Sequence, residues 1–385
     1  MIIGINGYEA VVPRFGYDSK TGLPRRVGSG EYCFQLLFNL NKIDKKNNYI
    51  IYLPQNPTAD LPKESSKWHY KIVRPRKLWT LLGLSLEFLL RRSKPDVFLS
   101  PTHYLPVFAP AQSVISIMDV SYIRFPELFK SADLNKLVKW TKYSAKKAKR
   151  IFTISKASKD DIIKTYGIPE DRVAVTYPGV KFEIQNPKSE TDLKFKMQNS
   201  KLLKDKYGVE GEYVLFVGTL QPRKNIARLI EAFSKLNKPS LDLIIVGKKG
   251  WKFEEILTAP EKFGVENNVK FLDSVSDEDL PTFYKNAICF VLPSLYEGFG
   301  LPVLEAMEYG CPVVTSNVSS LPEAGGDAAL YVNPQDIGDI KNKLELIIND
   351  GELRKKLIKK GYDQVKKFSW EKTARKTLET LENIK

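Results

Sequence analysis

Two carboxylates, Glu297 and Glu305, are separated by seven residues in the second half of the chain. Between them lies the run Gly298-Phe299-Gly300-Leu301-Pro302, which follows a strongly apolar stretch. Proline is well tolerated where a helix begins, so this pattern predicts a strand, a glycine-rich turn and then a helix. The N–H groups at such a helix start form an anion site. Because a carboxylate repels phosphate, its place here is best explained by sugar or ribose hydroxyls that donate hydrogen bonds to it.

A second loop, Gly218 to Asn225, carries the adjacent cations Arg223 and Lys224 after Gly218 and Thr219. Arginine offers a planar fork and lysine a point charge, and both suit a diphosphate. Glycine lets a ligand approach the backbone. A helix-start turn with two solvated cations is the alternative interpretation. A third polar turn, which contains Ser320, is expected to add backbone donors to the same site.

Buried-strand runs alternate with helical stretches along the whole chain, which predicts an α/β fold with two doubly wound parallel sheets. Five strands are expected in each half: 2–6, 49–53, 97–100, 114–117 and 150–154, then 213–217, 242–246, 269–272, 287–292 and 312–315. Helices are expected between them at 30–40, 136–149, 156–166, 225–236, 279–286, 303–309 and 337–349. Ligands of such sheets bind beyond the carboxyl ends of the strands, where the three loops fall.

At 385 residues the chain exceeds what one hydrophobic core usually serves, so two domains are expected. We place an N-terminal domain at 1–180, a linker rich in Lys, Glu, Asn and Ser at 181–210, and a C-terminal domain at 211–369. The last helix, 370–385, is a candidate to pack back on the first domain.

Cysteine and histidine usage restricts the class of protein. Three widely spaced cysteines fit a reducing compartment and argue against a disulfide framework. Two histidines make a histidine-rich zinc site improbable. The first residues resemble a buried strand and not a signal peptide, and the apolar stretch 78–90 is shorter than the ~20 residues of a membrane-spanning helix. A cytoplasmic protein, soluble or peripheral on the inner face of a membrane, is expected.

The net charge of +15 is unusual, and the cations cluster in the N-terminal half. One cluster flanks the apolar stretch: Arg74, Arg76, Lys77, Arg91, Arg92 and Lys94. The other contains Lys136, Lys139, Lys142, Lys146, Lys147, Lys149 and Arg150. Basic residues beside apolar helical faces suit an anionic membrane surface. Nucleic acid and plain solvated helix faces are the alternatives, although the aromatics are not arranged as stacking platforms.

The three loops, in this order, resemble those of retaining glycosyltransferases of the GT-B class, glycosyltransferase family 4. The shared features are Glu297-x7-Glu305 in a Tyr-Glu-Gly-Phe-Gly-Leu-Pro motif, the loop Gly218 to Asn225, and the turn Ser319 to Glu323. Further matches in the N-terminal half extend the resemblance over nearly the whole chain. It implies two Rossmann-like domains facing each other across a cleft, and transfer of a hexose from a nucleotide diphosphate sugar, such as GDP-mannose or UDP-glucose, to a glycan or lipid-linked acceptor in polysaccharide biosynthesis.

The resemblance also implies roles for residues of the donor site. Arg223 and Lys224 would stabilise the diphosphate as the sugar leaves, Glu305 would bind the ribose, and Glu297 would contact the transferred sugar. The remaining donor contacts would come from Gly218, Thr219, Val275, Gly298, Phe299, Gly300, Leu301 and Ser320. No cofactor and no metal are expected, because the cations and helix N-termini supply the electrostatic stabilisation.

In the N-terminal half, Gly28, Ser29 and Gly30 would face the diphosphate and acceptor. An ordinary helix entry is the alternative. Relatives have histidine where this chain has Met118, and methionine cannot shuttle a proton. Asp119 is a candidate for part of that role or for capping the next turn, and His103 is a further catalytic candidate.

Three other classes of function stay open. A non-hydrolysing sugar-nucleotide epimerase has the same architecture but relies on cleft histidines. A catalytically weak sugar-nucleotide-binding protein is motivated by Met118, and a nucleic-acid-binding protein by charge alone. Asp277-Glu278-Asp279 matches the DxD motif of metal-dependent transferases, but its position before an amphipathic helix indicates capping.

Overall fold

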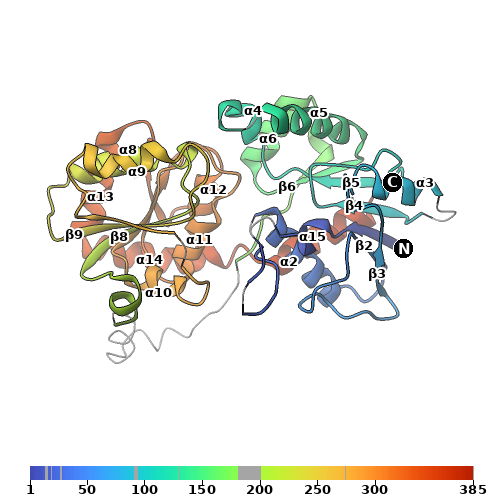
Figure 1. The fold of residues 1–385 in the computed structure, drawn as a ribbon, viewed down its shortest axis with the longest axis horizontal. Coiled ribbons are helices and arrows are strands. Elements are labelled where there is room, and N and C mark those ends of the chain that lie inside the picture. The colour runs from blue at the N-terminus through green and yellow to red at the C-terminus, as the bar shows by residue number, and fades with distance from the viewer. Residues whose placement is uncertain are drawn as a thin grey trace. The chain divides into compact units, whose positions relative to one another are not determined.

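The computed structural model describes residues 1–13, 16–18, 20–26, 28–90, 94–129, 131–180, 201–273 and 275–384, with the backbone alone at 128 and 131–133. Two compact units emerge, Met1–Gly179 with Ser369–Lys385, and Val180–Phe368. Each unit is built on its own parallel sheet (Figure 1).

The first unit contains a seven-stranded parallel sheet in the order β3-β2-β1-β4-β5-β6-β7. Its strands are β1 (Ile2–Asn6), β2 (Asn48–Leu53), β3 (Trp68–Ile72), β4 (Val97–Ser100), β5 (Ser113–Ser116), β6 (Arg150–Thr153) and β7 (Val173–Val175). Successive side chains of a strand point to opposite faces. Accordingly, Leu99 belongs to one hydrophobic core and its neighbour Phe98 to the other.

Helices cover both faces of this sheet. They are α1 (Tyr8–Val11), α2 (Ser29–Ile43), α3 (Gly83–Leu90), α4 (Ser121–Arg124), α5 (Ser131–Lys147), α6 (Lys156–Tyr166) and α15 (Trp370–Glu382). The core with Leu99 includes side chains of α1, α2 and α15, and the core with Phe98 includes side chains of α3, α5 and α6.

The C-terminal helix α15 belongs to the first unit and packs on α2. The Trp370 ring meets the Tyr32 ring edge-on, with centroids 5.7 Å apart. At the other end of the helix, Asn47 Nδ2 donates a hydrogen bond to Glu382 Oε1 at 2.9 Å. Aromatic packing and a polar contact therefore hold α15 at both ends.

The second unit contains a six-stranded parallel sheet in the order β10-β9-β8-β11-β12-β13. Its strands are β8 (Glu212–Val217), β9 (Leu241–Val246), β10 (Val269–Leu272), β11 (Cys289–Leu292), β12 (Val313–Ser316) and β13 (Ala329–Val332). Its α-helices include α8 (Ile226–Ser234), α9 (Glu254–Lys262), α10 (Leu280–Asn286), α11 (Leu301–Glu308), α12 (Leu321–Gly325), α13 (Ile337–Asn349) and α14 (Gly351–Val365).

The expected fold class, two doubly wound α/β halves, is confirmed, but the expectation of five strands in each is wrong. The additional strands β3, β7 and β13 all lie at sheet edges. Helices and neighbouring strands cover an edge strand less completely than a central one. Most residues of β3 are accordingly exposed or half-buried, so β3 lacks the continuous apolar run that marks a buried strand. Of the expected linker 181–210, residues 181–200 lie outside the described part, whereas residues 201–207 are helical with Leu203 buried.

Candidate functional site

The two loops that carry the predicted chemistry meet at the switch point of the second sheet. Strand order runs from β8 outward to β10 on one side and from β11 to β13 on the other. The loop with Arg223 and Lys224 follows β8, and the loop with Glu297 follows β11. The connections after β8 and β11 run to opposite sides of the sheet. This reversal opens a crevice at the carboxyl ends of the two strands, where ligands of this fold bind.

Glu297 forms ion pairs with both cations of the first loop. Lys224 Nζ donates to Glu297 Oε1 at 2.6 Å, and Arg223 Nη1 donates to Glu297 Oε2 at 3.0 Å. Glu297 is 7% exposed and Lys224 8% exposed, while the Arg223 side chain is 18% exposed. The structure thus brings together three residues that are 73 and 74 positions apart in sequence.

The cations determine the protonation state of this carboxylate. Burial alone would raise the pKa of Glu297, but the charges of Arg223 and Lys224, with hydrogen bonds from Lys224 and Ser294, outweigh it and lower the pKa to about 2. Glu297 is therefore ionised at neutral pH. The cluster carries two positive charges against one negative charge, so a positive charge is left at the carboxyl edge of the sheet.

Three serines, two of which the sequence did not single out as site residues, hold the Glu297 loop in place. Ser294 Oγ donates to Glu297 Oε1 at 2.7 Å, and Ser319 Oγ accepts from the Glu297 N–H at 3.0 Å. Ser320, an expected donor contact, donates through Oγ to the Glu297 carbonyl at 2.8 Å. The third polar turn therefore fixes the backbone of the second loop. Ser294 lies just before the Tyr-Glu-Gly motif and Ser319 opens the Ser319–Glu323 turn, and these positions are the signal that would have identified them.

Asn225 joins the loops that follow β8, β11 and β13, a role that the sequence did not reveal. Its Nδ2 donates to the carbonyls of Pro293, at 3.0 Å, and Pro334, at 2.6 Å. The residue has a φ of 62°, a left-handed conformation that asparagine tolerates better than most residues. Its position at the end of the Arg-Lys-Asn motif was the available signal.

Helix α11 begins directly after the Glu297 loop. Gly300 precedes it with a φ of 103°, and a Cβ there would approach Leu321 Cδ2 to 2.8 Å, so a side chain would be strained in two ways. Pro302 lies in the first turn, as expected. The neighbouring Phe299 ring packs against Phe368, with centroids 5.3 Å apart. Gly298 and Phe299 are buried, and Leu301 opens the helix.

Glu305 contacts a different partner from Glu297. Its Oε2 accepts a hydrogen bond from the hydroxyl of buried Tyr284 at 3.1 Å. Burial and the Glu305 charge raise the pKa of Tyr284 well above its ordinary value, so this hydroxyl keeps its proton. Gly218 lies beside Lys224, while partly buried Thr219 and Val275 lie in the loops after β8 and β10.

In the first unit, the Gly28–Gly30 turn packs against α1. Gly28 caps α2 with a φ of 54°. Ser29 Oγ donates to Glu9 Oε2 at 3.0 Å, and a Cβ on Gly30 would lie 3.1 Å from the Glu9 carbonyl oxygen. These contacts show a tightly packed helix entry.

The remaining candidates of the first unit have structural contacts. Asp119 Oδ1 accepts from the Ser121 N–H at 2.8 Å where α4 begins, which is the capping role. The His103 ring lies beside Tyr122, with centroids 5.8 Å apart. Met118 packs against the core that contains Leu99.

The acidic run 277–279 is tied to a neighbouring helix. Asp279 Oδ2 accepts from Lys206 Nζ at 2.5 Å and from the Tyr207 hydroxyl at 2.6 Å. Although desolvation raises the pKa of Asp279, these partners lower it to about 2. Among the described side chains, no group of three His, Cys, Asp or Glu residues is placed to hold a metal ion.

Two doubly wound parallel sheets, one with a buried Arg-Lys-Glu cluster at its switch point, define the class of GT-B glycosyltransferases. Residues 200–364 match the family model described as glycosyl transferases group 1, and residues 48–183 match glycosyltransferase family 4. The chain is 34% identical over 312 residues to O-antigen chain mannosyltransferase B of Escherichia coli, covering 80% of this chain and 78% of that protein. The chain therefore belongs to the group 1 glycosyltransferases of family 4 and is an enzyme of that class.

Two further similarities are to a second mannosyltransferase and to a solved structure. A serotype-specific mannosyltransferase of Escherichia coli, WbdA, is 32% identical over 256 residues, which cover 65% of this chain and 30% of that protein. The crystal structure of HepE from Anabaena in complex with UDP-glucose superposes with a TM-score of 0.69 at 18% identity, covering 99% of each chain. At that identity the superposition shows the shared fold.

Proposed function

We propose that this glycosyltransferase transfers a mannose from a nucleotide diphosphate sugar to a glycan or lipid-linked acceptor, with retention of anomeric configuration and without a metal. The buried cluster of Arg223, Lys224 and Glu297 carries the proposal. It places a net positive charge at the switch point, where a doubly wound sheet binds its nucleotide ligand.

The cluster suits departure of a nucleoside diphosphate. The bond between the anomeric carbon and the β-phosphate oxygen breaks, and negative charge develops on the diphosphate. Arg223 and Lys224 are held at a site of low exposure, so they stabilise this charge without reorganising. The acceptor hydroxyl forms the new bond on the same face of the sugar, and its proton passes to the leaving phosphate. Two fixed cations thereby do what a divalent metal does in other transferases.

Glu297 and Glu305 are assigned to two parts of the donor. Glu297 is held ionised and can accept hydrogen bonds from hydroxyls of the transferred sugar. Glu305 accepts ribose hydroxyls in the same way, with the Tyr284 hydroxyl orienting the carboxylate. The relatives named as mannosyltransferases favour GDP-mannose, and the fold shared with a UDP-glucose complex leaves UDP-glucose as the competing donor.

The relative named as an O-antigen chain transferase supports a growing polysaccharide as acceptor. The acceptor is assigned to the first unit, and the reaction to the cytoplasmic face of an anionic membrane. Among the described residues, no helix is long and apolar enough to cross a bilayer.

The test is donor binding and transfer by purified protein. Thermal shift with GDP-mannose, UDP-glucose and UDP-N-acetylglucosamine is expected to show stabilisation by GDP-mannose above the others, lost in Glu305→Ala. The product formed on a synthetic mannosyl acceptor should have an α-linkage by NMR. Its rate of formation should be unchanged in excess EDTA. Stabilisation by none of the donors, or inversion at the anomeric carbon, would overturn the proposal.

A further inference from the structure

Helix α3 of the first unit has an apolar side that faces solvent. Along and just before the helix, five leucines are between 44% and 78% exposed: Leu78, Leu82, Leu86, Leu89 and Leu90. The spacing of three and four residues places Leu82, Leu86, Leu89 and Leu90 on one side of the helix, whereas Leu78 lies in the turn before it with a φ of 49°. The Leu82 N–H donates to the Leu78 carbonyl, and the Leu86 N–H donates to the Leu82 carbonyl. These hydrogen bonds connect the turn that contains Leu78 to α3. Leu84 and Phe88 fill the core from the opposite side, and the five outer leucines are not among the side chains of that core.

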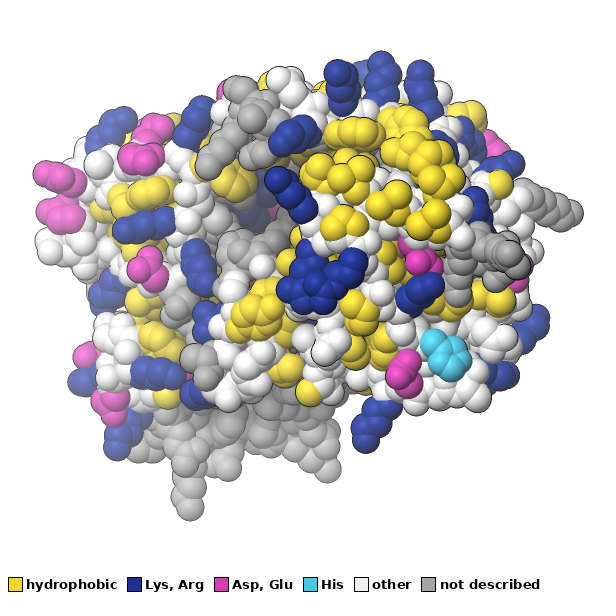
Figure 2. All heavy atoms as spheres, turned by 45° about the vertical axis from the view of Figure 1, so that its right-hand side comes forward, with side chains coloured by type: hydrophobic (Ala, Val, Ile, Leu, Met, Phe, Trp, Pro, Cys, Tyr) yellow, Lys and Arg dark blue, Asp and Glu magenta, His cyan; other side chains and the backbone are white. Residues whose placement is uncertain are grey.

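A neighbouring loop extends this apolar surface. Val107 and Phe108 are 39% and 45% exposed, and the Val107 N–H donates to Ser85 Oγ on α3 at 2.7 Å. The Leu105 N–H donates to Ser144 Oγ on α5 at 2.9 Å, so the loop joins α3 to α5. Figure 2 turns the side of Figure 1 that carries α3 toward the viewer and shows hydrophobic side chains gathered there with lysines and arginines around them. We call the exposed side chains of 78–90 and 107–108 the apolar face.

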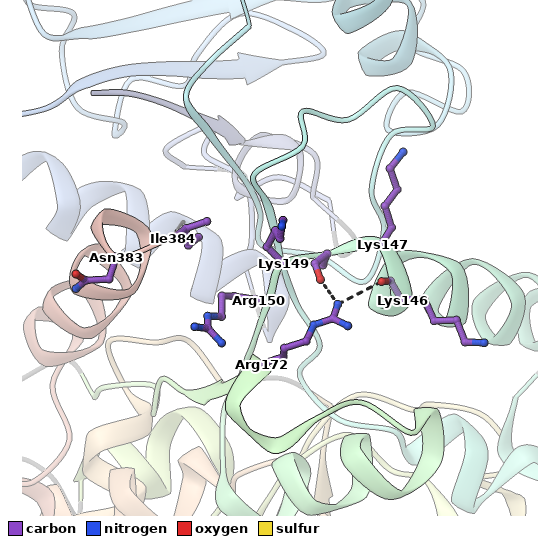
Figure 3. Close-up of a pocket in the computed structure, with 8 residues that line it drawn as sticks. Lys146, Lys147, Lys149, Arg150, Arg172, Asn383 and Ile384 are labelled. Carbon is purple, nitrogen blue, oxygen red and sulfur yellow. Dashed lines mark hydrogen bonds between the residues drawn. The ribbon is translucent and has the colours of Figure 1, made fainter.

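A basic groove adjoins the apolar face at the end of α5. Lys147 connects the two, because its Nζ donates to the Val107 carbonyl and lies 5.5 Å from the centroid of the Tyr143 ring. The groove has a volume of about 490 Å³ and is lined by Lys146, Lys147, Ala148, Lys149, Arg150, Arg172, Asn383 and Ile384 (Figure 3). Among these described lining residues, five are cationic and none is acidic.

The groove is built on a fixed backbone. Arg172 donates to the carbonyls of Lys146, at 3.2 Å, and Ala148 (Figure 3), and also to that of Ala145, at 3.1 Å, and thereby satisfies the end of α5. Arg150 donates to the Asp171 carbonyl at 2.5 Å. Lys146 and Lys149 are exposed. The arginines thus shape the groove, and the lysines present charge to what lies outside it.

We propose that the apolar face and the basic groove together dock the first unit on the surface of an anionic lipid bilayer. The eight residues of α3 extend over about 12 Å, so the helix lies in the interface with its leucines toward the acyl chains. The lysines of the groove then lie at the level of the lipid phosphates. An uncharged protein partner would account for the leucines but not for the exposed lysines beside them, and nucleic acid would account for the lysines but not for the leucines.

This inference rests on the proposed function only through the choice of a lipid-linked acceptor, and it concerns residues outside the donor site. The test is sedimentation of full-length protein with vesicles of phosphatidylcholine alone or with about one-third phosphatidylglycerol. We expect binding to the anionic vesicles at least about 10-fold tighter than to the neutral ones, weakening with added NaCl.

Two sets of variants separate the apolar from the basic contribution. Leu82→Ser with Leu86→Ser and Leu89→Ser is expected to weaken partition by about 100-fold through loss of interfacial burial. Lys146→Glu with Lys149→Glu is expected to weaken it by at least about 25-fold, because each lysine near an anionic surface contributes about a fivefold gain and each introduced glutamate adds repulsion. Leu346→Ser and the pair Lys356→Glu with Lys359→Glu are exposed positions of the second unit that carry the same chemical changes, and they should bind as the wild type does.

Several outcomes would overturn the proposal: equal binding to neutral and anionic vesicles, binding to neither, or wild-type binding by the leucine variant. If the leucine variant fails to fold by circular dichroism, Phe108→Ser on the loop replaces it, with a loss of at least about threefold expected. Tight, salt-sensitive binding of an RNA oligonucleotide without vesicle binding would assign the groove to nucleic acid. Because the leucine variant should keep its thermal shift with GDP-mannose and Glu305→Ala should keep vesicle binding, failure of docking and failure of donor recognition are distinguishable.

Discussion

The two sheets have the same strand order around their switch points, but different side chains meet there. In the first unit the switch lies between β1 and β4, where Asn6 Nδ2 donates to Ser100 Oγ at 2.9 Å and both residues are fully buried. In the second unit it lies between β8 and β11, where Arg223 and Lys224 pair with Glu297. The same topology thus holds a neutral pair in one unit and an ion cluster in the other.

The difference teaches what the shared architecture does and does not determine. A buried neutral pair needs its donors and acceptors hydrogen-bonded, whereas a buried ion also needs its charge balanced. The second unit meets that requirement with Ser294 and two cations on the Glu297 carboxylate. Strand order positions a crevice in both units, and the loop residues make one of them a charged site.

Removal of Lys224 tests this comparison most severely. Lys224→Ala leaves Glu297 buried with one cation, so we expect a loss of about 3 kcal/mol in the free energy of unfolding. We also expect kcat to fall by roughly 100- to 1,000-fold, since a cation at the leaving group is lost. Urea unfolding and transfer kinetics measure the two effects. Lys356→Ala, at an exposed position of the same unit, should change neither, and near-normal activity of Lys224→Ala would show that the cluster is structural only.

Acid sensitivity should distinguish the two switch points. The pKa of Glu297 is lowered to about 2 from its ordinary 4.5, so its stabilisation is complete above about pH 4.5 and is lost as pH falls toward 2. This linkage amounts to about 3 kcal/mol over that range. Glu297→Gln should remove that part of the pH dependence of the free energy of unfolding, and exposed Glu352→Gln should retain it. An unchanged pH profile in Glu297→Gln would mean that the carboxylate is not held by the cations in solution.

The sequence predicted the charged switch point better than the neutral one. Arg223, Lys224 and Glu297 are in loops with glycine and proline signals after apolar strands, so their place at the sheet edge could be predicted. The role of Asn225 could not, because its side chain reaches carbonyls 68 and 109 positions away in the sequence. The edge strands β3, β7 and β13 were missed because their pairing depends on a neighbouring strand and not on a local apolar run. Local pattern predicted the framework, and long-range hydrogen bonds completed the site.

A smaller effect is expected at Tyr284, which positions Glu305. Tyr284→Phe removes the hydroxyl that lies 3.1 Å from Glu305 Oε2 without changing the packing of the ring. Loss of one hydrogen bond of this kind is worth about 1 kcal/mol, so KM for the donor should rise about fivefold while kcat stays unchanged. Steady-state kinetics with varied donor measure this split. A fall in kcat with unchanged KM would place Tyr284 in the chemical step and contradict a positioning role.

The smallest effect is expected at Met118, on the carboxyl side of β5 in the first unit. The family resemblance implies a histidine at this position in relatives. In this chain the Met118 side chain packs against the core that contains Leu99. Met118→Leu keeps its volume and apolar character, so kcat/KM should stay within about twofold and the free energy of unfolding within about 1 kcal/mol. Transfer kinetics and urea unfolding decide the matter. A tenfold loss of kcat/KM at unchanged stability would mean that the thioether itself contacts substrate, and the first unit would then contribute chemistry that its neutral switch point does not suggest.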